Sequence, residues 1–340
     1  MSSLDIGIDL GTSNLIATDV EHSTLIREPA VVALSTRTGQ VIGIGQEVYR
    51  MIGREPKTIQ IVHPLRDGVI SDFKMTEVML KYLLKKICGG SLLKPRVALC
   101  VPSAITPVES RAVIDSAVGA GARKVYLIEE PVAAAIGAGV DISKPEGNLI
   151  VDIGGGTCDI AVLSLYGIVC KASLKVAGGR FDEALIRYIR GRYNLLIGDK
   201  SAEELKMKVG TVFPEEGAPE EYWDIKGRDL LTGLPKKIQI SRSETVEPLQ
   251  EQIYSIIRAV QGVLEKTPPE LVGDIRTNGI ILTGGGSLLH GLDRLMEQET
   301  HVVTRTAPEA LECVAMGTAK SFDYLGKLFD GFVNPSTHTH

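Results

Sequence analysis

Residues 6–13, IGIDLGTS, and residues 149–157, LIVDIGGGT, are the two stretches that decide the fold of this 340-residue chain. In each, a short aliphatic run ends in an aspartate, Asp9 or Asp152, and then in a turn that contains glycine. A second aliphatic run follows after a few polar residues, so each stretch predicts a β-hairpin. Two copies of one hairpin indicate two homologous halves that face each other. The alternative is two unrelated glycine turns.

The turns of these hairpins are suited to binding phosphate. Backbone N–H groups of a glycine turn approach phosphate oxygens closely, because no side chain blocks them and because glycine accepts positive φ. The carboxylates of Asp9 and Asp152 could then flank a Mg²⁺ ion that bridges the phosphates through water. For either aspartate alone, a cap or a turn former is the commoner role.

A third glycine turn closes residues 280–287, IILTGGGS, and a helix is expected around residues 292–296. The backbone of this turn could pack flat against the face of a purine. It could equally be an ordinary connection between a strand and a helix. Only together with the other two turns does it indicate a nucleotide.

Two adjacent glutamates, Glu129 and Glu130, precede Pro131 and an alanine-rich run. Proline suits the first turn of a helix, and alanines allow that helix to pack tightly beside a strand. One of the two glutamates could therefore orient a water molecule for attack on a terminal phosphate. Both could also be surface residues at the start of a helix.

Two further groups allow an ordinary and a functional interpretation. Ser201 and Glu204 have the spacing of a capping box, which leaves Glu203 and Lys206 one turn apart on one helix face. That face is either a solvated ion pair or a pair of ribose contacts. Cys158 follows the second turn, but no histidine lies near it in sequence, so a buried or loop thiol is favoured over a nucleophile.

Composition describes a soluble globular chain and excludes several classes of protein. Hydrophobic residues make up 44% and charged residues 23%, which is enough material for two cores. A net charge of -5, with no long block of either sign, argues against nucleic acid as a partner. Five cysteines without a CxxC pair argue against a disulfide framework or a zinc site, and fit a reducing cytoplasm. With no apolar run near the roughly 20 residues that span a bilayer, a secreted or transmembrane chain is not expected.

Strand and helix patterns alternate between the hairpins. Periodicity predicts two helices and two strands there, at residues 75–87, 109–118, 97–101 and 124–128 respectively. This alternation predicts α/β layers with mixed sheets. Residues 31–45 and 179–245 are interpreted as small inserts, one on each half, and the tail from Asn334 onward as disordered.

These elements, in this order, resemble the actin, hexokinase and heat-shock chaperone superfamily. The resemblance rests on two phosphate motifs, an adenosine motif and two connecting helices, at residues 9–12, 152–159, 282–287, 130–136 and 315–319. Within the superfamily, the chain is similar to the MreB/Mbl family of bacterial actins along nearly its whole length. That narrower match is carried by residues 64–72, 127–131, 232–236 and 265–271.

The resemblance implies an actin-like ATPase fold, with two ribonuclease-H-like halves around a nucleotide cleft. Each half would carry a small inserted subdomain. The implied subdomains are IA, residues 1–31, 67–141 and 313–340; IB, 32–66; IIA, 142–178 and 246–312; and IIB, 179–245.

The resemblance further implies that ATP and Mg²⁺ bind between the halves, with Asp9 and Asp152 near the metal. The residues implied for phosphates are Thr12, Ser13, Asn14, Gly155, Gly156 and Thr157; for ribose, Glu203 and Lys206; for the adenine side, Gly284, Gly285, Gly286 and Ser287. Glu130 is expected to orient the water, because it directly precedes the proline at the matching superfamily position. The chain departs from the family at Cys158, where a second threonine is usual, and at Arg180, which replaces an acidic residue.

Members of the family bind the inner face of the cytoplasmic membrane, and the expected localisation is cytoplasmic and peripheral on that face. Here Leu92 and Leu93, in a loop with Lys94 and Arg96, are the expected membrane contacts, since exposed leucines beside basic residues suit an anionic lipid surface. The alternative is that both leucines begin a buried strand. The implied partners are further copies of the chain, in paired protofilaments, and the membrane proteins of cell-wall synthesis.

Three functions are carried forward from these patterns. The leading one is a cytoskeletal ATPase whose membrane-bound polymer organises cell-wall synthesis and maintains rod shape. The second is a small-molecule kinase of the same fold, which would need a polar acceptor pocket and a further catalytic aspartate. The third is a non-polymerising regulatory ATPase.

Overall fold

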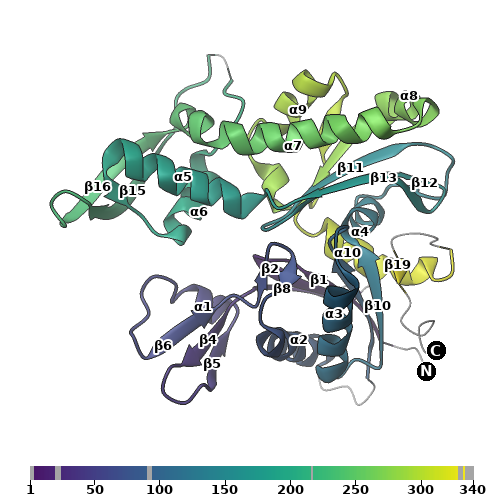
Figure 1. Ribbon diagram of the computed structural model, residues 1–340, viewed down its shortest axis with the longest axis horizontal. Helices are drawn as coiled ribbons and strands as arrows, with labels where there is room; N and C mark the ends of the chain where they lie inside the picture. Colours follow the sequence, from purple (N-terminus) through teal and green to yellow (C-terminus); the bar gives the residue numbers. More distant parts are fainter. Residues whose placement is uncertain (1–3, 20–23, 90–93, 216, 328–331, 334–340) are drawn as a thin grey trace.

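A computed structural model describes residues 4–19, 24–89, 94–215, 217–327 and 332–333 of the chain. Two of the expectations fall outside this part: the membrane contacts Leu92 and Leu93, and the tail from Asn334. The described residues form two layered α/β bodies, one above the other in Figure 1, and each carries a smaller extension on its left side. The predicted class, α/β with mixed sheets, is confirmed.

The first body is built on a six-stranded sheet in the order β19-β10-β9-β1-β2-β3. β1 pairs antiparallel with β2, which confirms the first predicted hairpin, and parallel with β9. The strands are β1 (Asp5–Leu10), β2 (Asn14–Asp19), β3 (Thr24–Pro29), β9 (Arg96–Val101), β10 (Lys124–Glu129) and β19 (Phe332–Val333). Helices α2 (Phe73–Cys88) and α3 (Pro107–Gly119) contribute to the same hydrophobic core.

The second body repeats this arrangement. Its sheet has the order β18-β17-β11-β12-β13, so that β11 corresponds to β1, β12 to β2 and β17 to β9. The strands are β11 (Asn148–Ile153), β12 (Cys158–Ser164), β13 (Gly167–Leu174), β17 (Ile280–Thr283) and β18 (Thr304–Thr306). Its later helices are α7 (Val246–Lys266), α8 (Pro269–Asn278) and α9 (Leu292–Thr300). Apart from β19, which adds a sixth strand at one edge of the first sheet, the two sheets have the same strand order, which confirms two homologous halves.

The inserts carry their own small sheets. The first holds β4 (Val32–Ser35), β5 (Val41–Ile44), α1 (Gln46–Tyr49) and β6 (Ile59–Val62), followed by the short β7 (Leu65–Arg66) and β8 (Val69–Ile70). The second holds α5 (Gly178–Tyr193), β14 (Leu195–Leu196), α6 (Asp199–Val209), β15 (Tyr222–Asp229) and β16 (Pro235–Ser241). The hairpin β15–β16 was not predicted, because the alternation in each strand is short, with Trp223 and Ile225 in one and Ile238 and Ile240 in the other, among polar residues, glycine and proline. The exact subdomain limits stay a prediction.

Local capping explains where the predicted helices begin. Asp72 accepts a hydrogen bond from the Met75 N–H at the start of α2, and Thr106 with Glu109 forms a capping box at the start of α3. The expected capping box at Ser201 was wrong. Helix α6 begins two residues earlier, at Asp199 after Gly198, so Ser201 lies inside its first turn.

Two short helices join the halves: α4 (Glu130–Gly137) and α10 (Cys313–Lys320), both at predicted connecting-helix positions. They cross between the two bodies (Figure 1), at a separation that only glycine permits. A Cβ on Gly317 would lie 1.7 Å from the Ala133 carbonyl oxygen, and one on Gly137 would lie 1.8 Å from the Cys313 carbonyl oxygen. Around this crossing lies a core whose side chains come from both sheets, so the halves pack as one unit.

Replacing Gly317 with alanine should destabilise the protein, because the added Cβ would overlap the Ala133 carbonyl oxygen. Relieving that overlap would require α4 and α10, and with them the two halves, to move apart. Overpacking of this kind costs about 3 kcal/mol, which a lower midpoint of urea unfolding would report. The matched control is Gly262→Ala on α7, where a Cβ meets nothing within 4 Å. There, alanine should raise the free energy of unfolding by about 0.5–1 kcal/mol. Equal midpoints for Gly317→Ala and the unaltered chain would contradict the close crossing.

Candidate nucleotide site between the two halves

The two predicted phosphate turns meet each other. A Cβ on Gly155 would lie 2.1 Å from Ser13 Oγ, and one on Gly156 would lie 2.4 Å from Thr12 Oγ1. Thr12 Oγ1 also accepts a hydrogen bond of 3.0 Å from the Gly68 N–H. The tips of the two hairpins therefore face each other with backbone and hydroxyl groups, and a larger residue than glycine would not fit between them.

The third glycine turn lies against the second. β17 runs parallel to β11 with Thr283 beside Asp152, and Thr283 Oγ1 donates a hydrogen bond of 2.7 Å to Asp152 Oδ1. Gly284 has φ 79°, and a Cβ there would lie 2.4 Å from the Ile153 carbonyl oxygen. The turn continues as a 3-10 helix (Gly285–Leu288), in which the Ser287 hydroxyl donates back to the Gly284 carbonyl. The Ser287 side chain thus stabilises the turn, and only the backbone remains to face a ligand.

Asp9 and Asp152 occupy equivalent positions at the ends of β1 and β11, as their spacing predicts. Burial raises the pKa of Asp9 to about 6, although the Cys100 thiol opposes this by donating to Asp9 Oδ1 over 3.0 Å. Burial likewise raises the pKa of Asp152 to about 7, against the lowering effect of the Thr283 hydrogen bond. Two buried carboxyls are costly to ionise, and a cation beside them would lower that cost.

The structure separates the roles of the two adjacent glutamates. Glu130, the first residue of α4, is buried, and Thr157 Oγ1 lies 3.4 Å from its Oε2. Burial, then the charges of nearby aspartates, raise the pKa of Glu130 well above its usual range. Glu129 instead accepts from Lys171 Nζ on β13 over 2.7 Å. The geometry thus leaves Glu130, the glutamate chosen from the sequence, as the one beside the phosphate turns.

Asp159 is a site residue that the sequence interpretation missed. It lies directly opposite Asp152 in the β11–β12 pair, and opposite residues of an antiparallel pair share one face of the sheet. Its Oδ1 accepts from the Ser103 N–H over 2.8 Å, and a hydrogen bond with the Glu130 carboxyl contributes to the raised pKa of Glu130. The available signal was its position in the second strand of the hairpin, in register with Asp152.

The expected pair of Glu203 and Lys206 does not form. Lys206 Nζ lies 2.9 Å from Asp182 Oδ1 and donates to the Gly178 carbonyl over 3.1 Å, beside the second glycine turn. Burial raises the pKa of Asp182 to about 6, while Lys206 acts to lower it. Glu203 accepts from the Tyr49 hydroxyl of the opposite half. The solvated ion pair is therefore wrong, because each side chain has a stronger partner in another element.

The two departures from the family have separate surroundings. Cys158 is fully buried at the start of β12, which confirms a buried thiol, and burial raises its pKa well above the usual value. Arg180, in the first turn of α5, is half-exposed and donates to Glu183 over 2.8 Å. Neither side chain blocks the glycine turns.

The groups gathered between the halves fit a nucleotide phosphate chain with Mg²⁺. The turns offer backbone N–H groups and the hydroxyls of Thr12, Ser13 and Thr157, which suit phosphate oxygens. Within the described part of the chain, no group of three or more His, Cys, Asp or Glu side chains is arranged to hold a metal. Two aspartates alone would leave most positions around the ion to water and phosphate, as Mg²⁺ prefers.

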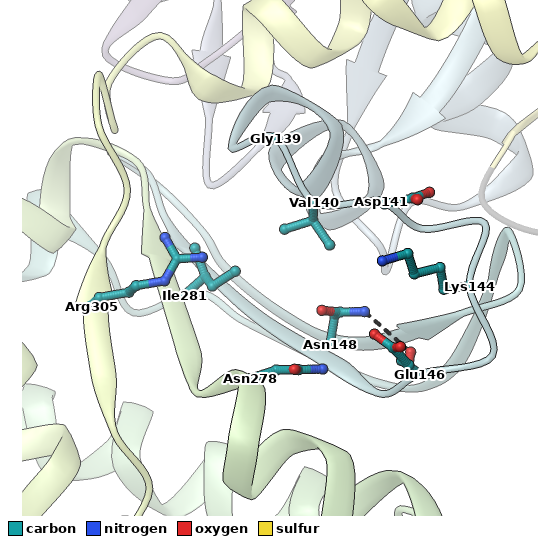
Figure 2. A pocket seen from close by; sticks show the side chains of 9 residues that line it. All are labelled: Gly139, Val140, Asp141, Lys144, Glu146, Asn148, Asn278, Ile281 and Arg305. Carbon is teal, nitrogen blue, oxygen red and sulfur yellow. Dashed lines mark hydrogen bonds between the residues drawn. The ribbon is translucent and has the colours of Figure 1, made fainter.

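A separate cavity of about 190 Å³ lies at the other end of the second sheet (Figure 2). Asn148, which begins β11, lines it with Val140, Ile281 and Arg305. The glycine turns follow the carboxyl ends of β11 and β17, whereas this cavity lies near their amino ends. None of the residues selected from the sequence lines it, and ligands of such sheets bind at the carboxyl ends of the strands.

None of the helices in the described part of the chain is both long enough and apolar enough to cross a bilayer.

Comparison with known proteins places this arrangement in a family. The family model described as MreB/Mbl protein matches residues 3–329. The chain is 47% identical to the cell shape-determining protein Mbl of Bacillus cereus over 329 residues, which are 96% of this chain and 98% of that protein. It is 44% identical to the cell shape-determining protein MreB of Escherichia coli over 331 residues, 96% of this chain and 95% of that one.

Solved structures agree with the sequence relatives. Crystal structures of MreB5 of Spiroplasma citri bound to ADP and to AMPPNP match with TM-scores of 0.90 and 0.91, both at 37% identity. They cover 95% and 96% of this chain, and 97% and 98% of theirs.

Replacing Asp152 with asparagine should stabilise the ligand-free protein above neutral pH. With a folded pKa near 7 and an unfolded pKa near 4, Asp152 contributes stability below pH 4 that is lost as the pH rises through 7. Asparagine cannot ionise, so at pH 8 the variant should gain about 2–4 kcal/mol in free energy of unfolding. Urea unfolding at pH 8 and pH 4.5 would measure this, and the gain should disappear at the lower pH. The control is the exposed Asp323→Asn, and an equal gain there would refute the assignment to burial.

Proposed function

The chain belongs to the MreB/Mbl family of cytoskeletal, actin-like proteins, and from that premise we propose that it binds ATP with Mg²⁺ between its two halves and hydrolyses it while assembling into filaments. Its fold matches that of MreB5, which was solved with ADP and with AMPPNP. These relatives favour neither the small-molecule kinase nor the non-polymerising regulatory ATPase. The observation that carries the proposal is the meeting of two aspartate-led glycine turns beside the buried Glu130.

The site residues keep the roles that the resemblance implies. Phosphates are assigned to the first two turns, the adenine side to the third turn, and ribose to α6. The proposed ligand groups are Thr12, Ser13, Asn14, Gly155, Gly156 and Thr157; Gly284, Gly285, Gly286 and Ser287; and Glu203 and Lys206. Asp9 and Asp152 would hold the metal, mostly through its water ligands.

Glu130 is the residue that we propose orients the attacking water. Its Oε2 lies 3.4 Å from the Thr157 hydroxyl, and its carboxyl also has a hydrogen bond with Asp159, so both contacts hold the carboxyl beside the second turn. Burial, and then the charges of the neighbouring aspartates, raise the pKa of Glu130 and so disfavour its ionised form. When bound, Mg²⁺ supplies positive charge beside those aspartates and the phosphates. An ionised Glu130 can then take a proton from the water as attack proceeds.

We extend the proposal to the partners of the filament. Copies of the chain would form paired protofilaments in the cytoplasm, on the inner face of the membrane, together with membrane proteins of cell-wall synthesis. The cell-shape function in the names of Mbl and MreB supports this link. Leu92 and Leu93 are the proposed lipid contacts. Because Arg96 is engaged by Asp5, the exposed Lys94 is the basic neighbour better placed for anionic lipid.

Replacing Glu130 with glutamine should leave nucleotide affinity nearly unchanged and cut hydrolysis by about 10²-fold, because the water-orienting group acts mainly in the transition state. Calorimetric titration with Mg·ATP would measure the affinity, and phosphate release would measure turnover. Glu129→Gln is the matched control, since Glu129 pairs with Lys171 away from the turns. Loss of turnover in Glu129→Gln but not in Glu130→Gln would mean that the other glutamate orients the water.

A Leu92→Ser, Leu93→Ser double variant should polymerise in solution but fail to float with anionic liposomes. Burying one leucine contributes about 1.5–3 kcal/mol, so a single subunit binds lipid weakly and a filament adds many such terms. Flotation with and without ATP would test both steps. Met207→Ser, at an exposed apolar residue on α6, should float normally. If the double variant unfolds instead, these leucines are core residues and the anchor lies elsewhere.

A further inference from the structure

We propose that Tyr49 is a positioning residue for the nucleotide site, which holds Glu203 of the opposite insert and slows the release of bound nucleotide. Tyr49 ends α1 in the first insert, and Glu203 lies on α6 in the second insert, 154 residues later in the chain. The Tyr49 hydroxyl donates to Glu203 Oε2. The inference rests on the proposed nucleotide site, and it adds a residue from the opposite half of the molecule.

The position of Glu203 along α6 places this contact at the edge of the site. Lys206, one turn further along the same helix, contacts the Gly178 carbonyl, and the Gly178 N–H in turn donates to the Gly154 carbonyl of the second turn. A helix rises about 1.5 Å per residue, so Glu203 lies roughly 5 Å along the axis from Lys206. Helix α6 therefore runs from the phosphate turns to Tyr49, with Glu203 between them.

Tyr49 is presented by an anchored helix. The Gln46 N–H at the start of α1 donates to Glu28 Oε2 over 3.0 Å, and Glu28 is itself paired with Lys86 on α2. Val48 is fully buried in the small core of the first insert. The hydroxyl of Tyr49 is thus fixed relative to the first half, so its bond to Glu203 couples the two halves.

The contact has a second component. Lys200 of α6 lies with its Nζ 5.1 Å from the centre of the Tyr49 ring, within range of a cation–π interaction. Burial and the Glu203 hydrogen bond both raise the pKa of Tyr49, so the phenol stays protonated and remains a donor. The donor acts on an acceptor that carries a charge, and such bonds are stronger than neutral ones.

This geometry leaves one carboxylate oxygen for the ligand. Tyr49 uses Oε2 of Glu203, so Oε1 remains for a ribose hydroxyl, and the hydrogen bond fixes the rotation of the carboxylate. Under this proposal, release of the nucleotide requires the inserts to part, and this bond must then break. Removing the phenol oxygen should therefore speed release more than it weakens binding of the phosphates.

The test is the release of a fluorescent ADP analogue, ethenoadenosine diphosphate, whose label is on the base and leaves both ribose hydroxyls free, from dilute protein with Mg²⁺ and an excess of unlabelled ADP. Tyr49→Phe keeps the ring and its contact with Lys200 but loses the donor, and should release the analogue about 10-fold faster, as expected for loss of a charge-assisted hydrogen bond. Tyr222→Phe, at an exposed tyrosine of β15, is the matched control and should release it at the unaltered rate. A Tyr49→Phe rate within twofold of the unaltered protein would overturn the inference.

A double variant shows whether Tyr49 acts through Glu203. In a Glu203→Gln background, Tyr49→Phe should add little further acceleration, because the charged acceptor is already gone. A full 10-fold addition would mean that Tyr49 acts on release by another route, and would also overturn the inference. Failure of the unaltered protein to bind the analogue at all would refute the proposed nucleotide site itself, an outcome distinct from normal binding with unchanged release.

Discussion

The close crossing of α4 and α10 is the contact on which the rest of the structure depends. Gly137 and Gly317 allow each helix backbone to touch the other, and the core around them draws side chains from both sheets. This contact fixes the distance between the two halves near one end of each sheet. The facing turns, the buried aspartates and the bridge between the inserts all follow from that distance, because each needs groups from both halves or from elements that the crossing aligns.

The second constraint is the burial of several carboxyl groups, which lowers the stability of the folded protein but suits the binding of a cation. Burial raises the pKa values of Asp9, Asp152, Asp159 and Glu130, and the charges of neighbouring aspartates add to this effect at Asp152 and Glu130. Such a group of carboxyls weakens the folded state without a compensating cation. The hydrogen bonds from Cys100, Thr283 and Ser103 offset part of this cost and hold the carboxyls in place. A site arranged in this way is prepared for a cation and phosphates at the expense of stability in the ligand-free protein.

The two halves share a topology but not a chemistry. Asp152 faces Asp159 across its hairpin, whereas the equivalent partner of Asp9 is Ile16. Likewise β17 ends in a glycine turn, whereas the corresponding strand, β9, is followed by Pro102 and Ser103, and the Ser103 N–H reaches across to Asp159. The second half thus contributes the additional carboxylate, and the first half contributes Glu130 and the backbone donor. The two sides of the candidate site therefore carry different chemical groups, although the two halves have the same strand order.

The sequence alone determined the features that depend on neighbouring residues. Glycine turns after Asp9 and Asp152, helix periodicity, and a proline after Glu130 act within a few residues, so the hairpins, the main helices and the family could be predicted. The hairpin β15–β16 was missed because its strands are half-exposed and only a few apolar residues alternate in each of them. The tertiary structure decided the partners of side chains far apart in the chain: Lys206 with Asp182, Glu129 with Lys171, and Tyr49 with Glu203. The pairing of Lys206 with Asp182 depends on how α6 packs against α5, and the other two depend on how the two halves pack. Such packing is set by many distant contacts at once, so no local pattern records it.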